Sequence, residues 1–224
     1  YLMIKNRKIL NENKIIYDYL LKLNFNKKET FNFKNDGAIL KQKKHKDIVI
    51  TNDSIIESVD FFAGDSAESV AQKIVTYNLS DLSSMGASPY CYTLSLLLPK
   101  GVTRNWIGKF TKKLFYLQKK YNFFLIGGDI GVSKKIHISS NFFGYVKKKF
   151  IIKRSGAKVG DSIWVTGNIG ESHLGLLIKK NKIKVNKKIN SYYLKKYSSP
   201  KPCMLGSKIL NYLNSGIDIS DGFL

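Results

Sequence analysis

The chain of 224 residues has 38 lysines and arginines against 16 aspartates and glutamates, a net charge of +22, and 43% apolar residues. This length and apolar content predict one or two soluble domains with a sizeable core and exclude intrinsic disorder. The longest nearly unbroken apolar run, 90–98, is about half of the ~20 residues that a membrane-spanning helix needs, and the amino end lacks a secretion signal. The sequence therefore predicts a cytoplasmic protein without a membrane anchor.

Apolar periodicity predicts strands and helices that alternate along the chain. In the first part we expect a helical face in the first 30 residues, strands at 47–53, 91–98, 123–126 and 136–146, and helices at 67–86 and after Thr103. In the second part we expect a strand at 162–166 and helices at 171–180, 189–198 and 203–214. This order predicts an α/β or α+β protein with two domains, 1–149 and 150–224.

The positive charge raises the possibility of a nucleic-acid-binding module, because lysines near phosphates bind polyanions without sequence preference. Only three of the 38 basic residues are arginine, the side chain that makes bidentate phosphate and base contacts. The densest basic runs, Lys41–Lys46, Lys147–Lys153 and Lys179–Lys188, fall between apolar segments. We therefore predict solvated loops at these runs and keep nucleic-acid binding as a disfavoured alternative.

The few carboxylates gather at predicted strand and loop ends beside glycines: Asp36, Asp53, Asp60, Asp81, Asp129, Asp218 and Asp221. Each one alone has an ordinary explanation, since aspartate caps backbone N–H groups at turns and helix starts. Together they indicate bound Mg²⁺, which prefers carboxylate, water and phosphate oxygens, with glycines that let a phosphate chain approach the backbone. The common glycine-rich nucleotide motifs are absent, so the residues indicate an Mg²⁺–nucleotide site of another type.

Five segments, in order and at matching spacing, resemble those of thiamine-monophosphate kinases. They are 78–89 (NLSDLSSMGASP), 126–129 (IGGD), 154–161 (RSGAKVGD), 165–167 (VTG) and 217–222 (IDISDG). The resemblance implies the two-domain fold of the aminoimidazole ribonucleotide synthetase-like ATP-binding superfamily. The amino-terminal sheet domain would dimerise, and the carboxyl-terminal α/β domain would be incomplete in this chain. The implied reaction transfers the γ-phosphoryl group of ATP to thiamine monophosphate and gives thiamine diphosphate, with Mg²⁺ as cofactor.

The resemblance also implies roles for individual residues. The implied metal ligands are Asp36, Thr51, Asn52, Asp53, Asp81, Asp129, Asp218 and Asp221. The implied ATP-binding residues are Gly128, Asp129, Arg154 and Ser220, with Asp129, Arg154 and Asp221 as the catalytic residues and Asp60 at the substrate. The acceptor is itself an anionic phosphate, so no strong general base is needed, and we expect direct in-line transfer without a phosphoenzyme.

The sequence departs from the family pattern at three places. Asn35-Asp36 stands where the family usually has two aspartates, Thr51-Asn52-Asp53 where it has Ser-Thr-Asp, and Asp60 where it commonly has histidine. The chain stops at 221–224, a turn that leads into an apolar residue, so we expect a missing carboxyl-terminal segment and incomplete activity of the 224 residues alone. The alternatives are a related enzyme with a different acceptor and an inactive scaffold.

Overall fold

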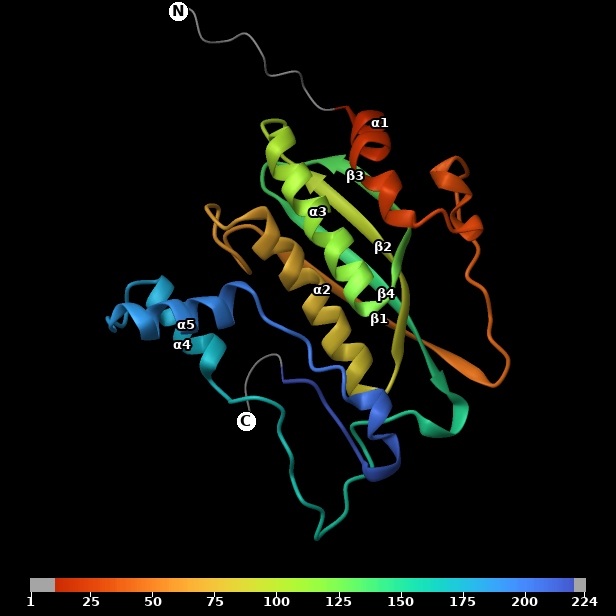
Figure 1. The fold of residues 1–224 in the computed structure, drawn as a ribbon, viewed down its shortest axis with the longest axis vertical. Helices are drawn as coiled ribbons and strands as arrows, with labels where there is room; N and C mark the ends of the chain where they lie inside the picture. The colour runs from red at the N-terminus through yellow and green to blue at the C-terminus, as the bar shows by residue number, and fades with distance from the viewer. Residues whose placement is uncertain (1–10, 220–224) are drawn as a thin grey trace, which may run out of the picture. The chain divides into compact units, whose positions relative to one another are not determined.

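A single β-sheet organises the computed structural model, which describes residues 11–219 as a mixed α/β protein (Figure 1). The four strands lie in the order β1-β4-β2-β3, with bounds β1 (Lys46–Ile56), β2 (Ser88–Leu98), β3 (Phe124–Val132) and β4 (His137–Lys147). Strands β2 and β3 are parallel, from Cys91 opposite Phe124 to Leu98 opposite Val132, with one irregularity after Tyr92. All four strands were predicted, although β1 and β3 extend beyond the predicted ends.

The chain divides into two compact units that do not follow the order of the sequence. Unit 1 comprises the chain up to Lys41, Asn52–Ile74 and Cys91–Asn141, and unit 2 comprises Gln42–Thr51, Val75–Tyr90 and Phe142–Leu224. The boundary between residues 149 and 150 stays a prediction.

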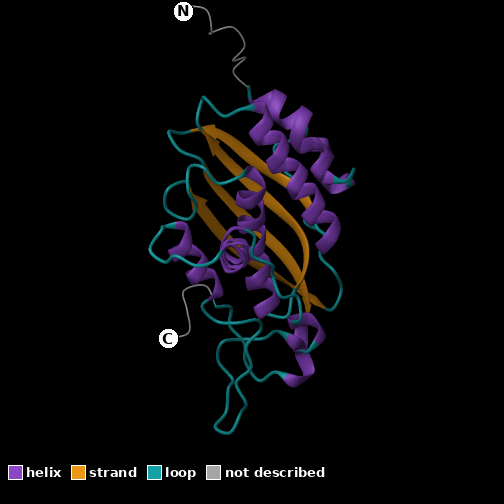
Figure 2. Cartoon of the chain, turned by 60° about the vertical axis from the view of Figure 1, so that its left-hand side comes forward, coloured by secondary structure: helices purple, strands orange, loops and turns teal. Residues whose placement is uncertain are grey.

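In unit 1, helix α3 (Arg104–Tyr121) connects the parallel strands β2 and β3, as such a pair requires. The Thr103 hydroxyl caps the helix by accepting a hydrogen bond from the Trp106 N–H group (3.1 Å), which confirms the predicted start. The predicted apolar stripe, including Ile107, Phe110 and Leu114, is buried. Helix α3 lies along the sheet in both ribbon views (Figures 1 and 2).

The amino-terminal helical face predicted for the first 30 residues forms as a chain of short helical segments. They are α1 (Glu12–Ile15), the π-helical η1 (Ile16–Leu20), and the 3-10 segments η2 (Leu21–Asn24) and η3 (Lys28–Phe33). The side chain of Gln118 on α3 donates a buried hydrogen bond of 2.6 Å to the Leu23 carbonyl. This contact joins the amino-terminal segments to the helix that connects β2 and β3.

Helix α2 (Ala67–Ser84) begins in unit 1 and ends in unit 2, where the predicted helices α4 (Glu171–Lys179) and α5 (Lys187–Ser198) are also found. Helices α4 and α5 pack against each other so closely that a Cβ atom on Gly175 would lie 2.1 Å from the Tyr193 carbonyl oxygen. Glycine at this position therefore allows the two backbones to approach.

Two predicted elements of the second part are wrong. Residues 162–166 are an exposed loop, because an isolated strand leaves its N–H and C=O groups unpaired and no strand of the described sheet pairs with this one. Residues 203–214 hold the 3-10 turns η5 (Gly206–Lys208) and η6 (Leu210–Tyr212) in place of an α-helix. The backbone here bonds to the Ser83 side chain, a remote contact that local periodicity does not reveal.

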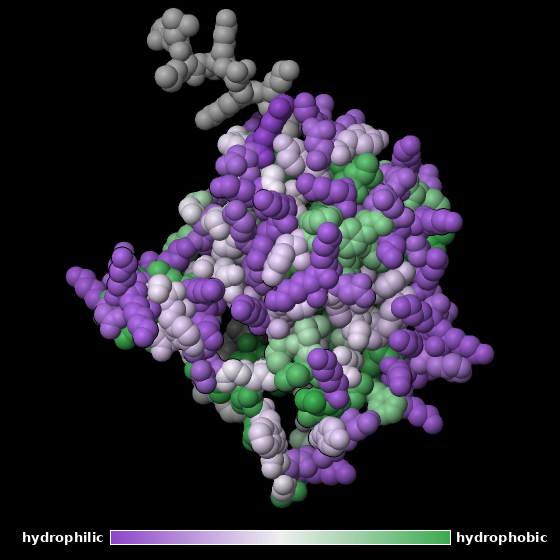
Figure 3. Space-filling model, in the orientation of Figure 1, coloured by the Kyte–Doolittle hydropathy of each residue, from purple (hydrophilic) through white to green (hydrophobic). Residues whose placement is uncertain are grey.

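The lysines of the three basic runs are exposed or half-buried and lie mainly between elements, including η4 (Lys148–Phe150), as predicted for solvated loops. The face of the molecule in Figure 3 is accordingly mostly hydrophilic. Among the helices of residues 11–219, none combines the length and the apolar character needed to cross a membrane.

Candidate functional site

The predicted site residues on β3 lie inside the strand rather than at its end. Gly128 lies opposite Leu94 of β2, and a Cβ atom on Gly128 would come within 2.0 Å of the Leu94 carbonyl oxygen. A glycine is therefore needed for the close approach of the two strands. Asp129 is exposed and lies opposite Ser95. The prediction of a strand end at residue 126 is wrong because parallel pairing with β2 continues to Val132.

The three predicted residues of β1 point alternately to the two faces of the sheet. Thr51 is buried and its hydroxyl donates a hydrogen bond of 2.9 Å to the Asn78 side chain on α2. Asn52 is exposed on the other face and donates a hydrogen bond of 2.7 Å to Asn141 of β4. Asp53 is half-buried on the Thr51 face and lies within β1, not at its end as predicted.

A row of polar side chains crosses the open face of the sheet in unit 1. From Asn141 the row continues to Thr93 of β2, whose hydroxyl accepts a hydrogen bond of 3.1 Å. Asp129 shares this face because it lies opposite Ser95, two residues after Thr93. Because side chains alternate along a strand, Asn52 and Asp129 lie on one face of the sheet, and Thr51 and Asp53 lie on the other.

The segment 78–89 places a buried amide and a half-buried carboxylate on α2. Asn78 is fully buried and accepts the Thr51 hydrogen bond described above. Asp81 follows three residues later on the same side of the helix and is half-buried. The sequence reasoning gave Asn78 no role, although its place one helical turn before Asp81 indicates a shared face.

In unit 2 the structure brings together two segments that are far apart in the sequence. The Arg154 guanidinium lies 3.8 Å from an oxygen of Asp218, and the Gly216 N–H group donates to the Lys153 carbonyl (3.0 Å). The Asn214 amide donates to both oxygens of Asp161, at 2.9 and 3.0 Å. The Lys158 N–H group and this amide lower the pKa of Asp161. Arg154 and Asp218, two predicted site residues, are thus held near each other, and Asn214 is a contributor that the sequence reasoning missed.

Asp60 belongs to a turn that follows β1 and rests on a buried lysine. One carboxylate oxygen of Asp60 accepts a hydrogen bond of 2.7 Å from the Ile56 N–H group. Its carbonyl accepts a hydrogen bond of 2.9 Å from the ammonium of Lys73, a side chain that is only 1% exposed. The turn is therefore firmly held, and at least one oxygen of the predicted substrate residue is engaged within it.

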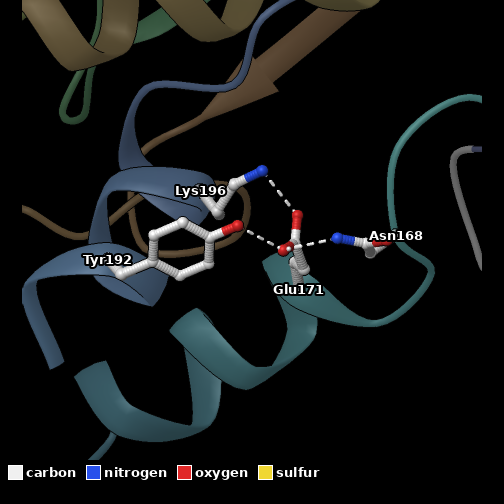
Figure 4. Close-up of polar contacts among 4 residues, drawn as sticks. All are labelled: Asn168, Glu171, Tyr192 and Lys196. Carbon is white, nitrogen blue, oxygen red and sulfur yellow. Dashed lines mark hydrogen bonds and ion pairs between the residues drawn. The ribbon is translucent and has the colours of Figure 1, made fainter. Parts of the chain in front are cut away.

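A second polar cluster lies on the α4–α5 pair and includes the turn before α4 (Figure 4). Glu171 accepts hydrogen bonds from the Tyr192 hydroxyl (2.6 Å) and the Asn168 amide (3.1 Å) and forms an ion pair with Lys196 at 2.6 Å. The Lys196 ammonium, followed by Tyr192 and Asn168, lowers the pKa of Glu171 from 4.5 to about 2. These contacts fasten the glycine turn at 167–170 to both helices.

The predicted metal ligands do not form one preassembled cluster in residues 11–219. No three aspartate, glutamate, histidine or cysteine side chains of this part lie close enough together to hold a metal ion. Asp36 is exposed in a bend, and Ser220 and Asp221 lie outside the described residues. The oxygen donors nevertheless fit Mg²⁺, which is commonly bound by one or two carboxylates, water and substrate phosphates. The arrangement fits separate ions that complete their coordination with a nucleotide.

Comparison with known proteins identifies the class to which this fold belongs. Residues 34–146 match the family described as AIR synthase related protein, N-terminal domain. The chain therefore belongs to this family. The predicted superfamily fold is confirmed.

Within this class, the chain is similar in sequence to curated kinases of one kind. The chain is 38% identical over 192 residues to the thiamine-monophosphate kinase of Buchnera aphidicola (from Acyrthosiphon pisum) and 35% identical over 192 residues to that of Escherichia coli K12. These matches cover 85% of this chain and 59% and 58% of the relatives. The chain thus spans about three-fifths of the length of the curated relatives it matches.

Solved structures agree with the sequence matches. The thiamine-monophosphate kinase of Stenotrophomonas maltophilia superimposes with a TM-score of 0.77 at 29% identity, covering 84% of this chain and 61% of that one. AaThiL complexed with AMPPCP and TMP superimposes with a TM-score of 0.75 at 28% identity, covering 84% and 60%. The predicted resemblance to thiamine-monophosphate kinases is confirmed.

Proposed function

We propose that the protein is an Mg²⁺-dependent kinase that transfers the γ-phosphoryl group of ATP to thiamine monophosphate and forms thiamine diphosphate. The observation that carries this proposal is the likeness to AaThiL complexed with AMPPCP and TMP, which extends over 84% of the chain. The 38% identity to a curated thiamine-monophosphate kinase supports the same substrates. A cytoplasmic location remains a prediction from the sequence.

In this proposal the polar residues of unit 2 bind the phosphates of ATP. Arg154 is exposed, and its planar guanidinium matches the oxygens of a phosphate. Asp218 lies 3.8 Å from this guanidinium and would attract it toward the same place before a nucleotide binds. Asn214 positions this pair because it ties the Arg154 segment to the Asp218 segment through Asp161.

The residues of unit 1 contribute a second set of oxygen donors. We propose that Gly128 brings the backbone close to the ATP phosphates and that Asp129 binds metal in the reactive complex. We also propose Asp36, Asn52 and Asp53 of this unit as metal ligands, with Asn52 and Asp53 binding separate ions because they lie on opposite faces of β1. Within unit 2 the proposed metal ligands are Thr51, Asp81, Asp218 and Asp221. When bound, Mg²⁺ neutralises the negative charge of the phosphates. The protein then has to orient donor and acceptor in line, which requires positioning rather than covalent catalysis.

We propose that Asp60 faces the substrate, at the position where the resemblance implies a histidine. A carboxylate here would repel the phosphate of thiamine monophosphate and attract the cationic thiazolium ring. The hydrogen bond from the Ile56 N–H group engages one carboxylate oxygen of Asp60. We therefore assign Asp60 to the ring of the substrate rather than to its phosphate.

We further propose that the protein is a homodimer that associates through the open face of its sheet. Thr93, Ser95 and Leu97 of β2 are half-exposed on this face, whereas Leu94 and Leu96 are buried on the other. Asn141 extends the same face onto β4, where its amide donates a hydrogen bond to Thr93. A second copy would cover this surface, and light scattering of the protein at several concentrations tests for the dimer.

The first experiment measures thiamine diphosphate formed from ATP and thiamine monophosphate by the full-length protein, with and without Mg²⁺. We expect product only with Mg²⁺ and a loss of about 100-fold or more in the Asp129→Asn variant. Asp18→Asn, an exposed aspartate on η1, is the matched control and should remain active. Absence of product while ATP still binds would contradict the proposed reaction and favour a different acceptor or an inactive scaffold.

A further inference from the structure

The segment between η2 and β1, residues 24–41, has an unusual backbone. Of the residues other than glycine with a positive φ angle, five lie within nine positions of this segment: Phe25, Asn26, Phe31, Asn32 and Phe33. Side chains other than glycine rarely adopt this left-handed conformation, because the Cβ atom crowds the backbone. Other contacts must therefore hold the segment, which we call the strap, in its present form.

Asn24 provides the first of these contacts from the interior. It is 1% exposed, and its amide nitrogen donates hydrogen bonds to Thr30 (3.3 Å) and to the Asn32 side chain (3.2 Å). Its carbonyl oxygen accepts a hydrogen bond of 2.7 Å from the Asn26 N–H group. One buried amide thus binds both left-handed stretches of the strap.

A clasp between Glu29 and Lys41 closes the far end of the strap. The Lys41 ammonium lies 2.8 Å from a carboxylate oxygen of Glu29, whose side chain is only 10% exposed. The Ile39 N–H group donates a hydrogen bond of 3.0 Å to the Glu29 carbonyl. The hydrogen bond from Lys41 lowers the pKa of Glu29, as expected for a paired carboxylate. The clasp therefore closes a loop of eleven residues, 30–40.

Asp36 and Gly37 lie within this closed loop, and both are exposed. A Cβ atom on Gly37 would meet no atom within 4 Å, so the tip of the loop is open to a ligand. A loop that is ordered before binding loses less conformational entropy when it contacts a ligand, and binding is correspondingly tighter.

We propose that Glu29, Lys41 and Asn24 are positioning residues that present the Asp36 carboxylate to an Mg²⁺-bound nucleotide. This inference rests on the proposed function, because it takes Asp36 as a metal-binding residue. It adds to that proposal a set of residues that touch neither metal nor nucleotide. These residues lower the free-energy cost of ordering the loop around Asp36 when the ligand binds.

The test measures binding of a non-hydrolysable ATP analogue to the full-length protein as Mg²⁺ is titrated. Opening the clasp with Glu29→Gln or Lys41→Met should raise the Mg²⁺ concentration at half-saturation by about threefold to tenfold. Analogue binding without Mg²⁺ should not change. The double reversal Glu29→Lys with Lys41→Glu should restore most of the affinity, and Glu12→Gln, an exposed glutamate on α1, should have no effect. Hydrogen exchange of the Ile39 amide should accelerate in Glu29→Gln and in Lys41→Met, but not in the double reversal or in Glu12→Gln.

Asp36→Asn separates this inference from the proposed function. It should raise the Mg²⁺ midpoint without accelerating exchange at Ile39. If Asp36→Asn raises the midpoint but Glu29→Gln only accelerates exchange, the clasp is merely structural and the inference is overturned. If Asp36→Asn leaves the midpoint unchanged, the strap does not present a metal ligand, and the inference is also overturned. Thiamine diphosphate formation would remain an independent measure of the kinase activity.

Discussion

The Ser83 hydroxyl on α2 accepts a hydrogen bond of 3.2 Å from the N–H group of Gly206 and donates one of 2.6 Å to the Cys203 carbonyl. A Cβ atom on Gly206 would lie 1.7 Å from the Ser83 carbonyl oxygen, so the two backbones are nearly in contact. One serine of the segment 78–89 thereby anchors residues 203–206, which lie more than a hundred residues later in the chain.

Removing this hydroxyl should destabilise the protein. Ser83→Ala leaves the Gly206 N–H group and the Cys203 carbonyl without this partner, which costs about 1–3 kcal/mol at a buried site. Ser84→Ala is the matched control, because the Ser84 hydroxyl bonds to the carbonyl of Asp81 within its own helix. Urea unfolding of the two variants measures the difference. Equal stability would show that the Ser83 contact contributes nothing.

The two adjacent glycines of β3 should differ sharply in their tolerance of alanine. Gly128→Ala forces a Cβ atom against the Leu94 carbonyl and should reduce the free energy of unfolding by about 1–3 kcal/mol or more. A Cβ atom on Gly127 meets nothing within 4 Å, so Gly127→Ala should be nearly neutral. Thermal unfolding compares the pair. A destabilised Gly127→Ala variant beside an unchanged Gly128→Ala variant would contradict the close approach of β2 and β3.

Arg154 should affect the binding of ATP more than the fold. A hydrogen bond to a charged group contributes roughly 1.5–3 kcal/mol, so Arg154→Met should weaken ATP binding by about tenfold or more. Lys153→Met removes a neighbouring exposed charge and serves as the control. Calorimetric titration with ATP and Mg²⁺ measures both affinities. Similar losses in the two variants would indicate general electrostatic attraction rather than a specific phosphate contact.

The Glu171 cluster should make the α4–α5 pair sensitive to acid. The pKa of Glu171 is lowered to about 2 in the folded state, so its carboxylate stabilises the fold above its ordinary pKa of 4.5. This contribution should disappear as the pH falls from about 4.5 to 2, when the folded state also takes up the proton. The Glu171→Gln variant should lose the dependence over this range. Circular dichroism during acid titration, compared with Glu12→Gln, checks the prediction.

The main strands, the helices α2 to α5 and the family resemblance could be predicted from the sequence, because they depend on local periodicity, caps and ordered motifs. Thr103, for example, caps α3 as its position indicated. The sequence also named Arg154 and Asp218, which the structure brings to 3.8 Å. It could not reveal which of Thr51 and Asn52 is buried, since that depends on the contact of Thr51 with Asn78 on helix α2.

Features that depend on partners remote in the sequence could be seen only in the folded structure. Residues 162–166 have the apolar character of a strand, yet a strand forms only when another strand satisfies its backbone groups. Residues 203–214 have the periodicity of a helix, but their backbone bonds to the Ser83 side chain and does not form one. The strap is held by Asn24 and by the Glu29–Lys41 clasp. These partners meet because the folded backbone brings them together. Local sequence determines which conformations are favourable, and tertiary contacts decide which of them the chain adopts.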